Sequence, residues 1–551
     1  MVVNNGAVVY LNQPRHLNFA RYIDIVRHLV SHISSLRQEM SYVEPYDQVI
    51  KLENLNTWIW RPNNSTMSDS RPLKYANEFV DFVNASPTPY HAVNTVKTHL
   101  INGGFTELSE RTSWNTSIKN GGKYFVTRNG SSLIGFTIGS KFQPGSGISI
   151  VGAHTDSPCL RIKPISKKSS EGFIQVGVEQ YGGLIAHSWF DRDLSIAGRV
   201  YVSEGENYVP KLIKIDKPLL RIPTLAIHLN REVNTKFEFN KETKMVPIAG
   251  QTAFDKNESE KKDEHTSCAD DPELQLSPEQ FESVQHVIQR HNQSLIELIA
   301  KEAGTTPNQI EDFELLLFDH QKSIIGGLND EFIFSPRLDN LTSCYTATVG
   351  IIEASQDLSE QRGIQLISLF DHEEIGSVSA QGADSSFLPD ILHRLTSFGE
   401  GADHFHEAMA KSFLLSSDMA HGVHPNYGEV YEGQNRPQVN QGPVIKINAN
   451  QRYATNSPGI VLLKKVADKA KVPLQLFVVR NDSPCGSTIG PMLSAKLGIR
   501  TLDLGNPQLS MHSIRETGGT YDVVRLVDLF KSFFEHYITL EEKILCDNVK
   551  I

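Results

Sequence analysis

The sequence contains few cysteines and no long apolar run. Its 551 residues include five cysteines, none in Cys-x-x-Cys spacing, which argues against a disulfide framework or a cysteine-based zinc site and favours a reducing compartment. No apolar run approaches the ~20 residues of a membrane-spanning helix. We therefore expect a soluble, intracellular protein that does not enter a membrane. The cysteines are Cys159, Cys268, Cys344, Cys485 and Cys546.

An excess of positive charge is missing as well. The formal net charge is −11, and acidic and basic residues are mixed along the chain. Nucleic acids and anionic membranes bind basic faces, so neither is expected as a partner. The chain has no GxSxG run for a serine hydrolase, and the glycine-rich "PCGSTIGP" lacks the lysine of a phosphate loop.

Two histidine-containing runs do not form the metal motifs that they resemble. His372 and Glu373 lie in "DHEEIGS", which does not continue to a second histidine as HExxH does. His404 and His406 are two residues apart in "HFHEA", and side chains at that spacing on a helix do not face each other. A helical zinc-protease motif is therefore excluded.

Residues 1–70 form an N-terminal extension with a pattern of their own. Within residues 19–36, apolar side chains recur at alternating spacings of four and three, which predicts an amphipathic helix with a narrow apolar stripe. The stretch bears arginines and almost no acids, as transit peptides do. Three interpretations stay open: helix–helix association, a transit peptide, or a helix docked on the rest of the protein. A linker rich in Pro, Asn and Ser, "IWRPNNSTMSDSRP", follows.

The rest of the chain divides into three segments. Residues 71–158 carry a helical pattern followed by strand-like runs, and residues 330–551 alternate strands and helices, which indicates an α/β layer architecture. Residues 159–329 consist mostly of short β-type runs. Within them, the polar and charged stretch near 251–278 predicts a mobile surface loop.

Residues of the kinds that bind metals follow strand-like or small-residue runs at five places. In open α/β sheets, ligand sites gather at the carboxyl ends of strands. Two or three imidazoles with several carboxylates suit zinc or a similar divalent ion. In a site with two ions, a shared carboxylate lies between them. The residues are His154 and Asp156, then Asp339, then Glu373 and Glu374, then Asp418 with His421 and His424, and finally His512.

Each of these residues also has an ordinary structural interpretation. A lone histidine after a strand is more often packed or hydrogen-bonded, and Asp339 could cap a helix. Neighbouring glutamates such as Glu373 and Glu374 are usually solvated. On a strand they would point to opposite faces, although in a loop both can reach one site. Several carboxylates beside buried runs would nevertheless be costly without a cation. The pattern by itself leaves the metal and structural interpretations evenly balanced.

Six separated motifs resemble those of a known family. The runs "GAHTDSP", "RLDN", "FDHEEIGS", "SSDMAHGVHPNY", "GPVIKIN" and "LSMHSIRE", in this order, are similar to the motif set of aspartyl aminopeptidases. These are di-zinc exopeptidases that remove N-terminal Asp or Glu, and vacuolar aminopeptidase I is a more distant member. The resemblance covers the chain from about Lys74 to its end. It implies a three-layer α/β metallopeptidase domain interrupted by a β-rich dimerisation domain, with dimers assembling into a tetrahedral dodecamer.

The resemblance also implies a role for each ligand-type residue. Asp339 would bridge two zinc ions in each subunit, and Glu373 would act as the general base. Asp156 would not bind metal itself but would orient the imidazole of His154, one of the metal ligands. The remaining ligands would be His154 and Asp418 for one ion, and Glu374 and His512 for the other.

Specificity residues follow from the same resemblance. His421 and Lys446 match a histidine and a lysine that hold the acidic side chain of the substrate. Without the family, the better interpretation of Lys446 is an internal salt bridge. His228 matches a histidine supplied by a neighbouring subunit to stabilise the oxyanion, although in isolation "LAIHLN" reads as an ordinary strand.

We expect an aminopeptidase for peptides with N-terminal Asp or Glu. The alternatives are a di-zinc aminopeptidase for neutral residues, and an inactive relative that serves as an assembly scaffold or autophagy cargo. We expect a cytoplasmic location. Residues 19–36 leave open vacuolar delivery by autophagy, as for the propeptide of vacuolar aminopeptidase I, or mitochondrial targeting.

Overall fold

The computed structural model describes residues 70–255, 283–396 and 403–544, together with the backbone of four short strands nearer the N-terminus. Those strands form two antiparallel pairs: β1 (Val2–Asn4) with β2 (Ala7–Val9), and β3 (Ile50–Lys51) with β4 (Trp58–Ile59). The helix expected within residues 19–36 lies outside the described residues, as does most of the loop expected near 251–278. No described helix has the length and hydrophobicity needed to span a bilayer.

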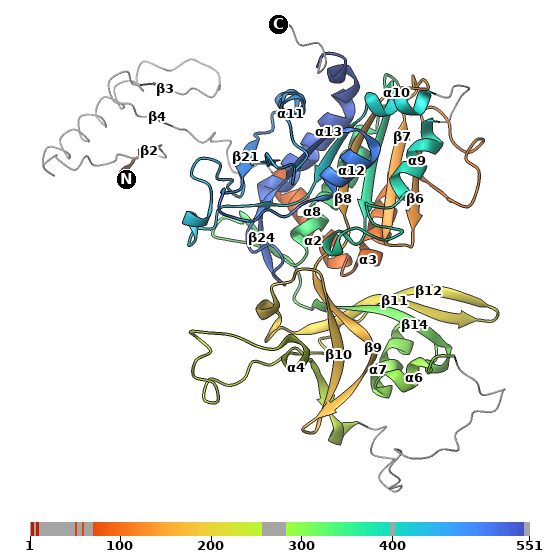
Figure 1. The fold of residues 1–551 in the computed structure, drawn as a ribbon, viewed down its shortest axis with the longest axis vertical. Helices are drawn as coiled ribbons and strands as arrows, with labels where there is room; N and C mark the ends of the chain where they lie inside the picture. The colour runs from red at the N-terminus through yellow and green to blue at the C-terminus, as the bar shows by residue number, and fades with distance from the viewer. Residues whose placement is uncertain are drawn as a thin grey trace, which may run out of the picture. The chain divides into compact units, whose positions relative to one another are not determined.

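A nine-stranded mixed sheet organises the larger part of the chain (Figure 1). Its four central neighbours, β17, β8, β18 and β22, run parallel, and antiparallel strands flank them on both sides. Central strands buried on both faces read as continuous apolar runs, as "ISIVGAH" does. In sheet order, the strands are β21 (Gln475–Val478), β20 (Val444–Ile447), β22 (Arg500–Gly505), β18 (Phe413–Ser417), β8 (Ile148–His154), β17 (Ile364–Phe370), β7 (Ser132–Ile138), β6 (Lys123–Arg128) and β5 (Thr106–Leu108).

Helices cover both faces of this sheet. Along β8, Val151 and Ala153 join one hydrophobic core and Ile148 and Ile150 join another, because side chains alternate across a strand. The expected three-layer α/β arrangement is therefore confirmed. The first core is closed by α2 (Ser70–Ala85), α3 (Pro89–Asn102), α8 (Leu338–Ala354), α11 (Ser457–Ala470) and α13 (Thr520–Glu541), and the second by α9 (Phe387–Thr396), α10 (His404–Ala410) and α12 (Ile489–Leu497).

A second, six-stranded sheet is built from residues between β8 and α8 (Figure 1). All its strands pair antiparallel, and α7 (Gln293–Glu302) packs into its separate core. The chain thus leaves the first sheet after His154, forms this insertion, and returns to the first sheet's helices. The strands in sheet order are β12 (Asn207–Lys214), β11 (Leu194–Glu204), β14 (Ile310–Asp319), β9 (Cys159–Ser170), β10 (Phe173–Tyr181) and β13 (Ile248–Gln251).

Small elements complete the region between the sheets. β15 (Ile324–Gly326), β16 (Phe332–Ser335) and β24 (Glu516–Gly519) form a three-stranded sheet, and β19 (Ala420–His421) pairs with β23 (Pro507–Gln508). β16 leads into α8 and β24 leads directly into α13, while β19 and β23 follow the central strands β18 and β22 in the chain.

Candidate metal centre

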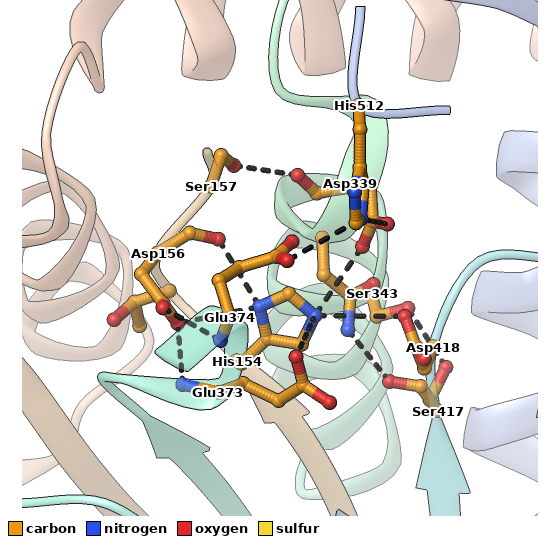
Figure 2. A network of polar contacts seen from close by, with 12 residues as sticks. His154, Asp156, Ser157, Asp339, Ser343, Glu373, Glu374, Ser417, Asp418 and His512 are labelled. Atoms are coloured by element: carbon orange, nitrogen blue, oxygen red, sulfur yellow. Dashed lines mark hydrogen bonds and ion pairs between the residues drawn. The ribbon is translucent and has the colours of Figure 1, made fainter. Parts of the chain in front are cut away.

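Three neighbouring parallel strands end at the candidate ligands. His154 is the last residue of β8, Asp418 follows β18, and Glu373 and Glu374 lie in a short 3-10 turn after β17. Because these strands are adjacent and parallel, their carboxyl ends meet at one edge of the sheet. Asp339 joins them from the start of α8, as Figure 2 shows.

The turn at Glu373–Ile375 sends both glutamates toward this edge. His372 before it and Gly376 after it have φ of 65° and 99°, so the backbone reverses within a few residues. Asp156 holds the turn: its Oδ1 accepts the N–H of Glu373 and its Oδ2 the N–H of Glu374, both at 3.1 Å (Figure 2). Adjacent glutamates can therefore serve one site because the strand has ended before them.

Asp339 lies between two groups of ligand atoms. Its Oδ1 is 3.3 Å from His154 Nε2, and its Oδ2 is 3.6 Å from His512 Nε2. On the first side, Asp418 Oδ1 lies 3.5 Å from His154 Nε2, and on the second side Glu374 Oε2 lies 3.3 Å from His512 Nε2. The structure thus brings together the five residues that the resemblance gave as ligands, with the Asp339 carboxylate between the two groups.

The donor atoms fit a divalent cation. Two sets lie with their ligand atoms within 4.8 Å of one another: His154, Asp339 and Glu374, and His154, Glu373 and Asp418. Within the described part of the chain, the buried Oδ1 of Asp339 and Oε1 of Glu374 accept no hydrogen bond. Buried carboxylate oxygens without a donor are costly, and a cation would satisfy them. Imidazole nitrogens and carboxylate oxygens together suit zinc.

The electrostatics of the cluster point the same way. Burial raises the pKa of Glu373 to about 7, and the neighbouring Asp418 adds to the rise. Burial, followed by Asp339, holds the pKa of Glu374 well above its usual range. Carboxylates crowded in a dry site resist ionisation unless positive charge is supplied. The cluster therefore favours a bound cation over a purely structural role.

A residue that sequence reasoning missed supports two of the ligands. The buried carboxylate of Glu516 accepts the N–H of Asp339 at 3.1 Å, the N–H of His512 at 2.9 Å and the amide of Gln508 at 3.1 Å. Burial, with Asp339 nearby, raises the pKa of Glu516 to about 8. Its only sequence signal is its place in "LSMHSIRE", because a carboxylate that serves backbone N–H groups has no motif of its own.

Lys446 lies at the edge of the cluster. It comes from β20, it is buried, and its Nζ is 3.2 Å from Asp418 Oδ2. This is the internal salt bridge considered as the alternative for this lysine, and it also places the cation beside the cluster. The ring of Tyr453, a second residue that the sequence did not suggest, lies 5.4 Å from Lys446 Nζ. His421, at the end of β19, is exposed at the surface, but much of its ring is packed against protein atoms. This partial burial lowers the pKa of His421, and the positive charge of Lys446 lowers it further.

His228 and His424 are not part of the cluster. His228 lies in an exposed turn closed by the N–H of Asn230 on the carbonyl of Ala226, so the strand suggested by "LAIHLN" is wrong. No strand in the described part of the chain pairs with these alternating apolar residues. Its neighbours Leu225, Ile227 and Leu229 are exposed as well. His424 Nδ1 accepts the N–H of Asn426 and so shapes its own loop.

The fold and the cluster together define a class. A three-layer α/β body that collects histidines and carboxylates at the ends of parallel strands is the architecture of a metal-dependent hydrolase. Residues 82–534 match the family described as Aminopeptidase I zinc metalloprotease (M18). The chain therefore belongs to the M18 family, and it is a metallo-aminopeptidase.

Individual relatives match over most of the chain. Aspartyl aminopeptidase 4 of Saccharomyces cerevisiae is 57% identical over 484 residues, covering 86% of this chain and 96% of the relative. The cryo-EM structure of the Ape4 and Nbr1 complex matches with a TM-score of 0.80 and 51% identity, covering 87% of this chain and 88% of the other. The mApe1 dodecamer of S. cerevisiae matches with a TM-score of 0.72 and 32% identity, covering 85% and 98%.

Proposed function

We propose that this aminopeptidase removes N-terminal Asp or Glu from peptides. The observation that carries the proposal is the buried ammonium of Lys446 at the edge of the cluster, 3.2 Å from Asp418. An ammonium has three donors, so Lys446 can bond to Asp418 and still bind a substrate carboxylate. The 57% identical relative named aspartyl aminopeptidase supports the same specificity.

The cluster would hold two zinc ions. Asp339 would give one oxygen to each ion, with His154 and Asp418 completing one site and Glu374 and His512 the other. Bound zinc would act as a Lewis acid on the scissile carbonyl and would lower the pKa of water nearby. Asp156, whose Oδ1 is 3.4 Å from His154 Nδ1, would keep that imidazole turned toward the ions.

Glu373 would move the proton. In this assignment its carboxylate is not a ligand, and its Oε2 lies 4.0 Å from His154 Nε2, close to the group that contains His154 and Asp418. A carboxylate with a raised pKa takes a proton from the attacking water and then gives it to the leaving amine. Its neighbour Glu374 would be a weaker base, because a bound metal ion withdraws electron density from the carboxylate.

The decisive experiment is turnover of Asp-, Glu-, Leu- and Lys-terminal peptides, with and without a chelator. We expect cleavage of the Asp and Glu peptides only, lost on chelation and restored by zinc. Cleavage of the leucine peptide at equal rate would support the neutral alternative. Zinc-loaded, assembled protein that cleaves none of them would support the scaffold alternative.

A Lys446→Met variant tests the acidic pocket itself. We expect kcat/KM for the Asp peptide to fall about a hundredfold, because the substrate carboxylate would be buried without its cation. Zinc content measured alongside should stay unchanged. The control is Lys465→Met, which removes an exposed lysine on α11. Equal loss of zinc and activity in the Lys446 variant would instead assign this lysine to holding Asp418.

Assembly and His228 are proposed together. The exposed apolar turn around His228 suits a contact with a second copy of the chain, and a dodecameric relative has the same fold. We propose dimers formed through the six-stranded sheet that assemble into a tetrahedral dodecamer, with His228 stabilising the oxyanion in a neighbouring subunit. His228→Ala and Glu373→Gln should each lower kcat by about a hundredfold or more. Oligomers assembled from a mixture of the His228→Ala and Glu373→Gln subunits should regain activity if His228 acts in a neighbouring subunit. They should stay inactive if His228 acts within its own subunit.

The cellular location is proposed as cytoplasmic. The charge and cysteine content favour it, and residues 19–36 are the segment that would redirect the protein to the vacuole or the mitochondrion. Imaging tagged full-length protein against a version that begins at Met67 distinguishes these outcomes.

A further inference from the structure

The segment Tyr181–Ile185 connects the six-stranded sheet to both halves of the metal centre. Tyr181, the last residue of β10, donates its phenol hydrogen to Asp156 Oδ2 at 2.7 Å. Two residues later, the carbonyl of Gly183 lies 3.0 Å from His512 Nδ1, and the N–H of Ile185 donates to the carbonyl of His512 at 2.9 Å. The insertion thus contacts a group behind His154 and a candidate ligand on the opposite side.

The phenol of Tyr181 influences the metal centre through its hydrogen bond to Asp156. The two carboxylate oxygens of Asp156 accept the N–H groups of Glu373 and Glu374. His154 Nδ1 lies 3.1 Å from the backbone carbonyl of Asp156 and 3.4 Å from its Oδ1. Asp156 therefore contacts a ligand imidazole through its backbone carbonyl and its carboxylate, and the same carboxylate holds the turn that carries the base. A displacement of Asp156 would move all three residues at once.

We propose that Tyr181 is a positioning residue of the metal centre, whose phenol fixes Asp156 and through it His154 and the turn at Glu373 and Glu374. The inference rests on the proposed function only in requiring that the cluster binds metal. It makes the inserted sheet a part of the active site and not only an assembly surface.

Burial explains why the phenol matters beyond its packing. Tyr181 and Asp156 are both buried, so water does not replace a donor that is removed. Burial also raises the pKa of Tyr181, which keeps the phenol protonated and able to donate. Gly182, with φ of 72°, fits closely on the turn: a Cβ there would lie 3.1 Å from Glu374 Cβ. The segment has little room to shift and compensate.

The test is Tyr181→Phe in the full-length, zinc-loaded enzyme. We expect zinc affinity in a chelator competition, or kcat, to fall about 10–100-fold, the usual cost of losing a partner behind a metal ligand. KM for the Asp peptide should change less than about twofold, because the Lys446 pocket is untouched. Tyr521→Phe, an exposed tyrosine on α13, is the matched control and should match the wild type.

A double-mutant cycle with Asp156→Asn separates positioning from packing. If the phenol acts through Asp156, Tyr181→Phe should have little further effect on zinc affinity in the Asp156→Asn background. Full additivity of the two losses would overturn the proposal, as would a single variant with wild-type zinc affinity and kcat. A lower thermal stability with unchanged zinc affinity and unchanged kcat would reduce Tyr181 to a packing residue. Wild-type protein that binds no zinc would instead overturn the proposed function.

Discussion

The two large sheets of this enzyme differ in where their charged residues lie. In the nine-stranded sheet, parallel neighbours end side by side, and His154, Glu373 and Asp418 meet at that edge. In the six-stranded sheet, antiparallel neighbours end at opposite edges, so its charges pair within the sheet. Arg199 there bonds to Glu314 through Nε at 2.9 Å and Nη2 at 2.5 Å. Parallel strands collect the polar residues that follow them at one edge, whereas antiparallel strands place such residues at opposite edges.

The contrast has one exception, at the junction of the sheets. Tyr181 ends a strand of the antiparallel sheet, yet it reaches a carboxylate of the parallel one. The insertion follows β8 directly, so its first hairpin, β9 and β10, returns to the edge where the chain left. Proximity in sequence to a ligand, rather than strand direction, brings this residue to the site.

The largest effect should come from changing the base at the parallel edge. Glu373→Gln keeps the shape of the side chain but cannot accept the proton, so we expect kcat for the Asp peptide to fall about a thousandfold. Zinc content and oligomer size should remain those of the wild type. Glu407→Gln, an exposed glutamate on α10, is the control. Unchanged turnover in the Glu373 variant would remove this residue as the base.

An intermediate effect should follow from loosening the backbone around the ligands. Glu516→Gln places an amide where the carboxylate now accepts three N–H groups, so Asp339 and His512 should lose a shared anchor. We expect zinc affinity to fall about 10–100-fold. The control is Glu542→Gln, which breaks an exposed ion pair with Arg362. Unaltered zinc affinity would show that the ligands are held without Glu516.

The smallest effect should come from a buried titratable group of the six-stranded region. Burial, with Arg290 nearby, lowers the pKa of His291 from 6.5 to about 4. As the pH falls below 6.5, the unfolded chain therefore binds a proton that the folded chain excludes, and stability is lost down to about pH 4. Between pH 7 and 5.5 we expect the wild type to lose about 1 kcal/mol more free energy of unfolding than His291→Gln, measured by urea denaturation. Turnover at pH 7 should be equal. An equal pH dependence of the two proteins would contradict the assignment.

Local pattern was sufficient for much of this protein. Apolar runs such as "ISIVGAH" indicated buried strands, and a polar ligand-type residue after each run indicated an edge where metal could bind. Both follow from properties of the chain itself, burial along a strand and the chemistry of a side chain. The same reasoning named the pair Glu373 and Glu374, although it left their partners open. Lys446 was named only by the resemblance to the family.

Other features depended on which distant segments pack together. "LAIHLN" has the pattern of a strand, but none of the described strands pairs with it and His228 lies in a turn. Tyr181 and Glu516 act on the site through hydrogen bonds to groups 25 and 177 residues away, at Asp156 and Asp339. The sequence by itself determined the strands, the ligand types and the family. Only the tertiary structure decided which residues form hydrogen bonds to the site, because a hydrogen bond depends on a distance in space that no local pattern records.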